Sequence, residues 1–413
     1  MTKEDNNIPK LRFPEFNQDW NPRTISDSIE ILKSGLSREL STIDIGLPVI
    51  RANNLQNYNL VLDDIKYWFK EDPKGAKTEN YYLKKNDILI NFINSESKMG
   101  TSCIIKNNFK RDTIYTTNIL RYVTKEAYDS YFHYIYTQTY NYKKWIKIIT
   151  KPAVNQASFT TVDFKKIPYY IPEFEEQRKI GNFFSKLDRQ IELEEQKLEK
   201  LEEQKKGYMQ QIFSQQLRFK DDKENNYPEW EEKLISDIGK VVTGNTPSKK
   251  ENEYWNSNQY VWVTPTDISN KKNISTSAYH LSQKGFEKAR QLPKNTLLIT
   301  CIASIGKNAI LRIEGACNQQ INAVIPNDNY DVDYLYYAFE EVSKLMKSIA
   351  GKTATQIVNK GIFEKLLLNV PILAEQKKIS DFLSKIDILI DMQGRKIEAL
   401  KKRKQGFLQK MFV

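Results

Sequence analysis

The sequence contains few of the residues that build catalytic or metal centres. Of its 413 residues, three are cysteine and two are histidine. Cys103, Cys301 and Cys317 show no Cys-x-x-Cys spacing, which argues against a zinc cage and fits a reducing cytoplasm. His133 and His280 stand far apart, so a zinc site or a Ser-His-Asp triad has almost nothing to be built from. We therefore predict no metal site and no catalytic residue on this chain.

Long apolar runs are also missing. The longest, Leu297–Ala303, is interrupted by Thr300 and is far shorter than the roughly 18 residues that a membrane span needs. Residues 1–10 are polar and include no apolar segment of the kind found in secretory signals. We expect a soluble protein of the cytoplasm.

What the chain has in excess is positive charge. Lys and Arg total 63 against 52 Asp and Glu, a formal net charge of +11. This balance favours a polyanionic partner, with nucleic acid as the first candidate and an anionic membrane surface as the second. The length predicts two or more domains, because single cores rarely extend over so many residues.

The chain repeats itself at a constant offset of 199 residues. Residues 173–213 match residues 372–412, and the similarity continues upstream, where WNPRTISD at Trp20 resembles WEEKLISD at Trp230. The shared pairs include Glu176/Glu375, Gln177/Gln376, Ile180/Ile379, Phe183/Phe382, Ser185/Ser384, Lys186/Lys385, Asp188/Asp387, Gly207/Gly406 and Phe213/Phe412. This is an internal duplication of a globular segment followed by a long charged helix. We place the boundaries at 1–172, 173–214, 215–371 and 372–413.

The globular halves have the pattern of β-rich domains. Short apolar runs bounded by Gly, Asn, Pro and Lys are typical of strands. The clearest are 87–91, 102–105, 118–123, 297–300 and 321–325. A Tyr-rich helix is predicted in each half, over 128–148 and 331–349. The fold class is therefore α+β, with two β-rich domains joined by two long helices in a pseudo-twofold repeat.

Both long helices carry apolar residues at alternating steps of four and three. The seam positions are Ile180, Phe184, Leu187, Ile191, Leu198 and Leu201 in the first, and Ile379, Leu383, Ile386, Ile390, Ile397 and Leu400 in the second. This spacing is typical of a coiled coil. Glu194 and Lys205 interrupt the first seam, and Gln393 and Lys404 interrupt the second at the same steps.

Charge favours pairing of the two helices with each other. Residues 175–206 hold eight basic and nine acidic residues, whereas residues 375–410 hold ten basic and five acidic ones. Each helix therefore meets a better complement in the other than in a copy of itself. In an antiparallel pair, one register places Glu194 opposite Lys404 and Lys205 opposite Gln393. We take this register as a hypothesis.

The repeated motifs resemble those of one family. Each variable globular half ends in an apolar-Pro segment, followed by Glu-Gln-(Arg/Lys)-Lys-Ile and Phe-x-Ser-Lys-(Leu/Ile)-Asp. This arrangement closely resembles the DNA-specificity subunit of Type I restriction-modification systems, over residues 11–413. The segment GNTPSKKENEYW at Gly244, followed by VWVTPTDIS, resembles the start of a target-recognition domain. The first half has KSGLSREL there and lacks the Thr-Pro-Ser, so we expect the two halves to read different bases.

The resemblance implies a division of labour along the chain. Each globular half would be a target-recognition domain that reads one part of a split site in double-stranded DNA. The long helices would form an antiparallel coiled coil that sets the spacing and docks two methyltransferase subunits, with endonuclease and translocase subunits joining the complex. No cofactor is expected on this chain, whereas S-adenosylmethionine, ATP and Mg are expected on the partner subunits.

Residue chemistry suggests which positions contact DNA. Phosphates are bound by Lys, Arg, hydroxyl and backbone N–H groups, and base edges by Arg, Lys, Asn and Gln. In the first half we predict contacts at Lys33, Ser34, Arg38, Arg51, Asn53, Asn54, Lys98, Lys151, Asn155 and Gln156. In the second half we predict them at Thr246, Ser248, Lys249, Lys250, Thr264, Thr266, Lys307, Lys352, Thr353 and Gln356.

Two other classes of function stay open at this stage. The chain could be a nuclease or methyltransferase that acts alone, or a coiled-coil adaptor unrelated to DNA. Asp87, Glu96 and Lys98 have the residue types of a metal-dependent nuclease, but the second half has Thr296 at the position of Asp87. Assays for cleavage and methylation by the chain alone, and a salt-dependent gel shift, discriminate between these functions.

Overall fold

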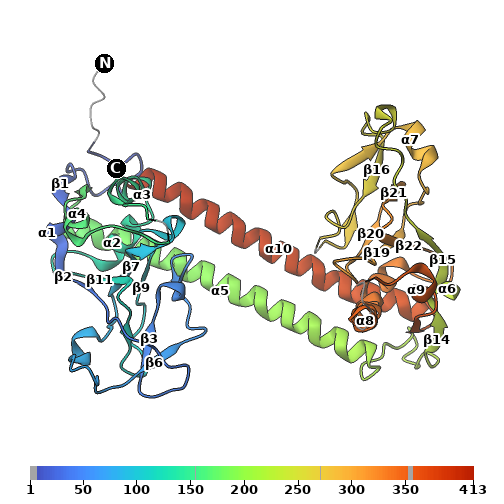
Figure 1. Cartoon of the computed structure of the whole chain (residues 1–413), viewed down its shortest axis with the longest axis horizontal. Helices are drawn as coiled ribbons and strands as arrows, with labels where there is room; N and C mark the ends of the chain where they lie inside the picture. The colour runs from blue at the N-terminus through green and yellow to red at the C-terminus, as the bar shows by residue number, and fades with distance from the viewer. Residues whose placement is uncertain (1–6, 154, 270, 352–356) are drawn as a thin grey trace. The chain divides into compact units, whose positions relative to one another are not determined.

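The structure is a computed structural model that describes residues 7–153, 155–269, 271–351 and 357–413 (Figure 1). It divides into two compact units, which are described separately. Unit 1 consists of Met1–Gln196 with Gly394–Val413, and unit 2 consists of Lys197–Gln393. Each unit contains one part of each long helix of the repeat.

A long helix occupies each of the two repeated charged segments. Helix α5 spans Phe174–Phe213 and helix α10 spans Leu373–Met411. Each begins two residues after a proline, Pro172 or Pro371, in keeping with the tolerance for proline at a helix start. Their interiors are rich in Leu, Glu, Lys and Gln, which favour helix, and contain no proline.

Unit 1 is built on an antiparallel four-stranded sheet with the strand order β2-β11-β7-β9. Its strands are β2 (Ile29–Ser34), β11 (Ile119–Thr124), β7 (Ile88–Asn91) and β9 (Ser102–Ile104). A second sheet contains β10 (Ile114–Tyr115), β3 (Leu47–Ile50) and β6 (Lys66–Trp68). The two-stranded pairs are β1 (Asn21–Thr24) with β13 (Pro168–Ile171), β4 (Leu55–Gln56) with β5 (Asn59–Leu60), and β8 (Ile93–Asn94) with β12 (Ala157–Ser158). The short helices are α1 (Ile25–Ser28), η1 (Ala52–Asn54), η2 (Thr78–Tyr81), η3 (Glu96–Lys98), α2 (Ser130–Tyr136), α3 (Tyr140–Ile149) and α4 (Thr161–Lys165).

Unit 2 repeats this plan with a larger sheet of strand order β15-β22-β19-β20-β17. Its strands are β15 (Gly239–Thr243), β22 (Ile321–Pro326), β19 (Thr296–Thr300), β20 (Asn308–Leu311) and β17 (Asn273–Ile274). The other strands are β18 (Tyr279–Leu281), β16 (Tyr260–Val263) and β21 (Gly315–Cys317) in one sheet, and β14 (Glu231–Leu234) with β23 (Leu367–Val370). The other helices are the short α6 (Ile235–Ile238), η4 (Asn252–Tyr254), α7 (Gln283–Lys288) and α9 (Lys360–Phe363), and the longer α8 (Val332–Ala350). Both units thus combine β-sheet with helices, as the predicted α+β class requires.

The predicted strands are confirmed, but one predicted helix is not continuous. All five apolar runs contain strands, namely β7, β9, β11, β19 and β22. The Tyr-rich helix of the second half is α8, whereas that of the first half is split into α2 and α3. The hydroxyls of Thr137 and Thr139 donate to the carbonyls of Tyr134 (2.6 Å) and Tyr136 (2.8 Å). Thr139 also caps α3 by accepting from the N–H of Tyr142, and such local bonds compete with helix continuation.

Each hydrophobic core includes the last turn of a long helix. In unit 1, the Phe412 ring lies 5.2 Å from Phe132 and 6.0 Å from Trp20 between centroids. In unit 2, the Phe213 ring at the end of α5 lies 6.0 Å from Tyr334. Phe412 and Phe213 are equivalent in the repeat, so both cores depend on a helix end supplied by the preceding or following half of the chain.

Candidate nucleic-acid interface

The glutamate of the repeated Glu-Gln pair anchors the start of each long helix. In unit 1, Arg12 makes two hydrogen bonds to the fully buried Glu176, at 2.6 and 2.7 Å. In unit 2, Arg218 binds the fully buried Glu375 in the same forked way, at 2.8 and 2.9 Å. The hydrogen bonds to these carboxylates raise the pKa of both arginines. This Arg–Glu pair, the glutamate lock, therefore attaches the start of each long helix to its domain.

The glutamine of the pair bridges two backbone segments. Gln177 donates to the carbonyl of Pro172 (2.9 Å) and accepts from the N–H of Asp129 (3.1 Å), the N-cap residue of α2. Gln376 makes the same two bonds in unit 2, to the proline carbonyl before α10 and to the N-cap residue of α8. A side-chain amide can satisfy a donor and an acceptor at once, which explains why glutamine occupies this position.

The seam residues of α5 and α10 face inward. Ile180, Phe184, Leu187, Ile191, Ile379, Leu383 and Ile397 are buried, and Leu198, Leu201, Ile386, Ile390 and Leu400 are partly buried. Within unit 1 the pairing of α5 with α10 is antiparallel, since Asp188 pairs with Lys404 (2.7 Å) and Glu195 with Lys401 (2.5 Å).

The polar seam positions do not pair as the hypothetical register required. In unit 1, the Lys404 ammonium binds Asp188, and Glu194 pairs with Lys396 at 2.5 Å. In unit 2, Lys205 binds Asp387 at 2.7 Å. The predicted register, with Glu194 opposite Lys404 and Lys205 opposite Gln393, is therefore wrong. The seam lysines instead reach the aspartates of the repeated Ser-Lys-x-Asp motif, which gives that motif a role in helix pairing.

Four predicted DNA contacts of the first half lie close together. β12 pairs with β8 through Ala157 and Asn94, and Lys151 bridges to Ser158. The exposed Asn155 and Gln156 precede β12, and the exposed Lys98 follows β8, so pairing of the two strands brings their flanking loops to one side. The set gathered here is Lys98, Lys151, Asn155 and Gln156.

The other predictions of the first half lie around strands β2 and β3, and several have partners inside the unit. Arg38 forms a forked pair with Asp72 (2.5 and 3.1 Å), and Arg51 pairs with Asp64 (2.7 Å). Asn54 is buried, and its side-chain amide donates to two backbone carbonyls and accepts from the N–H of Arg51. These bonds give Asn54 a role in the turn, and burial argues against direct contact with DNA. Lys33, Ser34 and Asn53 keep part of their surface exposed.

In unit 2 the structure brings four predicted residues to the wall of one open pocket. Lys249, Thr264, Thr266 and Lys307 line a cavity of about 970 Å³. Thr246 lies outside it and donates to Gln319 (2.7 Å), while Ser248 and Lys250 are exposed beside Lys249. Lys352, Thr353 and Gln356 lie outside the described residues.

The same pocket includes residues that the sequence interpretation missed. Lys271, Tyr279, Asn318 and Gln320 line it together with the buried Trp262. Tyr279 is an exposed residue (54%), so its ring is available for stacking. The amides of Asn318 and Gln320 bond to each other at 2.9 Å. The amide-rich stretch at 318–320 and the Lys-Lys pair at 271–272 were the available signals, because such groups bind base edges and phosphates.

The pocket wall also contains a strained backbone position. Ala303, in the turn between β19 and β20, has φ of +63°, a conformation that costs a non-glycine residue energy. Lys307 follows in the same turn, and its side chain is exposed. The pocket can therefore offer cations, amides, hydroxyls and one aromatic face to a polyanion with flat bases.

The residues of the alternative nuclease interpretation do not form an open site. Asp87 is 2% exposed, pairs with Arg121 at 2.7 Å and accepts from the N–H of Lys84 at 2.8 Å. Burial raises the pKa of Asp87, although Arg121 opposes the shift. Glu96 is exposed in η3. Within the described ranges, no three His, Cys, Asp or Glu side chains come together as a metal site requires.

No helix among the described residues combines the length and the apolar character needed to cross a membrane.

Comparison with known proteins places the chain among homologues of one kind. The family model of the Type I restriction modification DNA specificity domain matches residues 17–203 and 227–402. A putative type I restriction enzyme MjaX specificity subunit of Methanocaldococcus jannaschii is 24% identical over 417 residues, covering 98% of this chain and 95% of that protein. The EcoR124I/EcoR124II specificity subunit of Escherichia coli is 28% identical over 197 residues, 45% of this chain and 48% of that protein.

Solved structures show the same fold over almost the whole chain. The Type-I restriction-modification S subunit from M. genitalium superposes with a TM-score of 0.62 at 15% identity, over 98% of this chain and 99% of that one. A chain from a study of complex assembly and conformational transition of the type I R-M system gives 0.57 at 13% identity, over 95% and 97%.

Proposed function

Because the chain belongs to the Type I restriction-modification DNA specificity family, we propose that it is the non-catalytic subunit that selects the DNA sequence. Residues 1–172 would be the first reading domain and residues 215–371 the second, and each would read one part of a bipartite duplex target. The observation that carries this proposal is the unit 2 pocket, where Lys249, Lys271 and Lys307 surround hydroxyl and amide groups. Cations hold the phosphates, and the amides select bases.

The two long helices would act as the spacer between the half-sites. A helix of 40 residues, such as α5, is about 60 Å long at 1.5 Å per residue, more than the roughly 34 Å of one DNA turn. Antiparallel pairing within unit 1 and the Asp387–Lys205 pair within unit 2 support a coiled coil of fixed register. The target should accordingly contain an unspecified spacer of constant length.

Methyltransferase subunits would dock on the helices. On α10, Ile388, Leu389 and Met392 are 57%, 51% and 61% exposed, an apolar stripe on an otherwise charged helix. A protein partner would bury this stripe, whereas DNA would not, because the stripe lacks cations. S-adenosylmethionine would then be bound by the methyltransferase subunits, and ATP with Mg by the endonuclease and translocase subunits.

Methylome sequencing tests the proposal. Cells that express this chain with a methyltransferase subunit of a Type I system should acquire one bipartite methylation motif. Replacing residues 1–172 by the first domain of another family member should change one half of the motif and keep the other half and the spacer. If no motif appears, or if swapping one domain changes both halves, the assignment of one half-site to each domain is wrong.

A further inference from the structure

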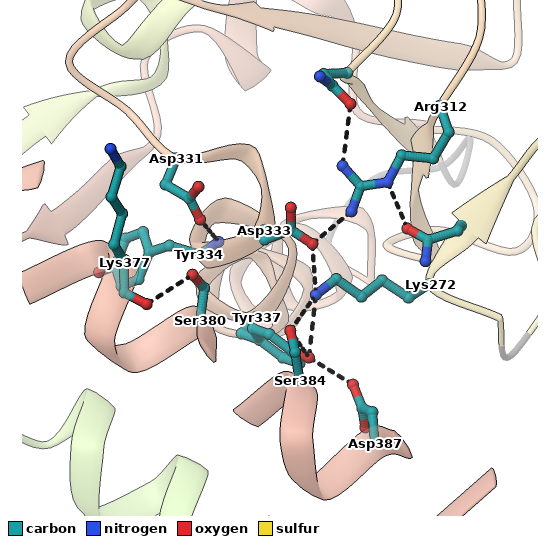
Figure 2. Close-up of polar contacts among 12 residues, drawn as sticks. Lys272, Arg312, Asp331, Asp333, Tyr334, Tyr337, Lys377, Ser380, Ser384 and Asp387 are labelled. Carbon is teal, nitrogen blue, oxygen red and sulfur yellow. Dashed lines mark hydrogen bonds and ion pairs between the residues drawn. The ribbon is translucent and has the colours of Figure 1, made fainter. Parts of the chain in front are cut away.

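Lys272 connects the sheet of unit 2 to two helices (Figure 2). It directly precedes β17, and its carbonyl accepts from the N–H of Ile310 in β20 at 2.7 Å. Its ammonium binds Asp333 of α8 at 2.6 Å and donates to Ser384 of α10 at 2.8 Å. A third bond, of 3.2 Å, reaches the hydroxyl of Tyr337. All three donors of the ammonium are therefore used.

The partners of Lys272 are themselves held in place. Asp333 also binds Arg312, which follows β20, at 2.5 Å. The Tyr337 hydroxyl donates to Asp387 at 2.5 Å, and Asp387 pairs with Lys205 of α5. The network thus joins the edge of the sheet to α8, α10 and the C-terminal half of α5.

A buried ammonium is an inefficient way to stabilise a fold. The Lys272 side chain is only 11% exposed, so its desolvation offsets much of what its bonds contribute. Apolar packing would hold the same elements together at less cost. The three bonds of the ammonium, in contrast, have defined directions and hold the chain at Lys272 in one position. Such an arrangement is expected where the position of the backbone matters more than the stability of the fold.

Lys272 lies next to the residues that form one side of the unit 2 pocket. Lys271 lines the pocket, as do Thr264 and Thr266 earlier in the same segment. The segment is held at its start by Asp267, which accepts from the N–H of Thr264 at 2.7 Å. Lys272, next to Lys271 and directly before β17, ties this part of the chain to α8 and α10.

We infer that Lys272 is a positioning residue that holds the pocket wall at the correct distance from the bases, so that selection of the second half-site depends on it. The inference rests on the proposed function. Lys272 acts through Lys271 and the threonines of the wall and does not contact DNA. Its loss should therefore weaken discrimination between sequences at the second half-site without removing a phosphate contact.

Binding of duplexes by the full chain in complex with a methyltransferase subunit tests this role. The probes are the cognate duplex found by methylome sequencing and duplexes with one base changed in either half. Lys272→Met should lower discrimination at the second half-site about tenfold and at the first less than about twofold, with an unchanged dependence of log K on log salt. Lys271→Met, the matched control, should reduce the salt slope by about 1.

Ser384→Ala provides a second variant if Lys272→Met fails to fold. It removes one acceptor of the ammonium and should reproduce part of the loss at the second half-site. Unchanged discrimination in a folded Lys272→Met complex, or equal losses at both half-sites, would overturn the inference. If the wild-type complex itself shows no bipartite preference, the proposed function fails instead.

Discussion

In unit 2 the sheet reaches the helices through the buried Lys272 network, whereas in unit 1 a cavity of about 1260 Å³ lies against Asp188, the equivalent of Asp387. A partly exposed pair, Lys106–Glu192 at 3.5 Å, links the first domain to α5. Both units nevertheless share the glutamate lock, the glutamine bridge and the aspartate–lysine pair. The repeat therefore preserves the attachment of each domain to the helices, while the interior contacts of each domain differ.

The helix ends provide the most severe test of this shared attachment. Phe412→Ala should destabilise unit 1 by about 4 kcal/mol, since a buried ring contacting three aromatic side chains leaves a cavity. Phe213→Ala should cost unit 2 about 2 kcal/mol, because Phe213 is only partly buried. Hydrogen exchange followed by mass spectrometry reports each unit separately. Equal protection losses in both units after either change would contradict the separate cores.

The glutamate lock should distinguish the units through one extra bond. Glu375→Ala removes the buried carboxylate partner of Arg218, which keeps only the exposed Glu229 (3.8 Å) as a counter-charge, and also removes the acceptor of the Trp230 indole N–H (3.2 Å). We expect a loss of about 3 kcal/mol in unit 2. Glu176→Ala should cost unit 1 about 1 kcal/mol less, because the buried Trp20 N–H has no partner among the described residues. Chemical denaturation monitored by exchange in each unit measures the difference, and a larger loss in unit 1 would refute it.

Acid should act on unit 1 more than on unit 2 through His133. Burial lowers the pKa of His133 from 6.5 to about 4, and its ring bonds the carbonyl of Asp129 (2.8 Å) and the hydroxyl of Tyr169 (3.0 Å). Between pH 6.5 and 4, His133 is protonated in the unfolded chain but neutral in the folded chain. The contribution of His133 to the free energy of unfolding is therefore fully present above pH 6.5 and is lost as the pH falls towards 4. At pH 5 the loss should be about 2 kcal/mol.

Exchange at pH 7 and pH 5, corrected for the intrinsic rates, checks this expectation. His133→Gln removes the titrating group and should flatten the dependence in unit 1, with unit 2 as the internal reference. A pH dependence that persists in this variant would assign the effect to another group.

The part of the fold that could be predicted follows from local sequence patterns. The strands and the long helices follow from apolar runs and from steps of four and three, which depend on neighbouring residues alone. The break between α2 and α3 was missed, because the threonine hydroxyls at 137 and 139 bond locally and end a helix that the aromatic pattern continues. The predicted register of α5 on α10 was wrong. The sequence offers the seam lysines Asp188 and Asp387 as partners as well as Glu194 and Gln393, and no local pattern selects among them.

The site was less predictable than the fold. Lys249, Thr264 and Lys307 were identified by residue type, but their convergence on one pocket depends on strands β16, β19 and β20. Tyr279 and Asn318 come from further strands or turns, and neither position has a local signature of binding. The partners of the repeated glutamates, 164 and 157 residues away, are likewise set only by the folded chain.

The smallest expected effect is the one that tests the difference between the interiors of the two units. Lys106→Ala removes an ion pair whose side chains are 36% and 37% exposed, so unit 1 should lose less than about 1 kcal/mol. Discrimination at the first half-site should stay within about twofold of wild type, in contrast to the loss expected for Lys272→Met at the second. Melting and duplex binding of the complex measure both quantities. A tenfold loss of discrimination after Lys106→Ala would mean that an exposed pair positions the first domain as the buried network positions the second.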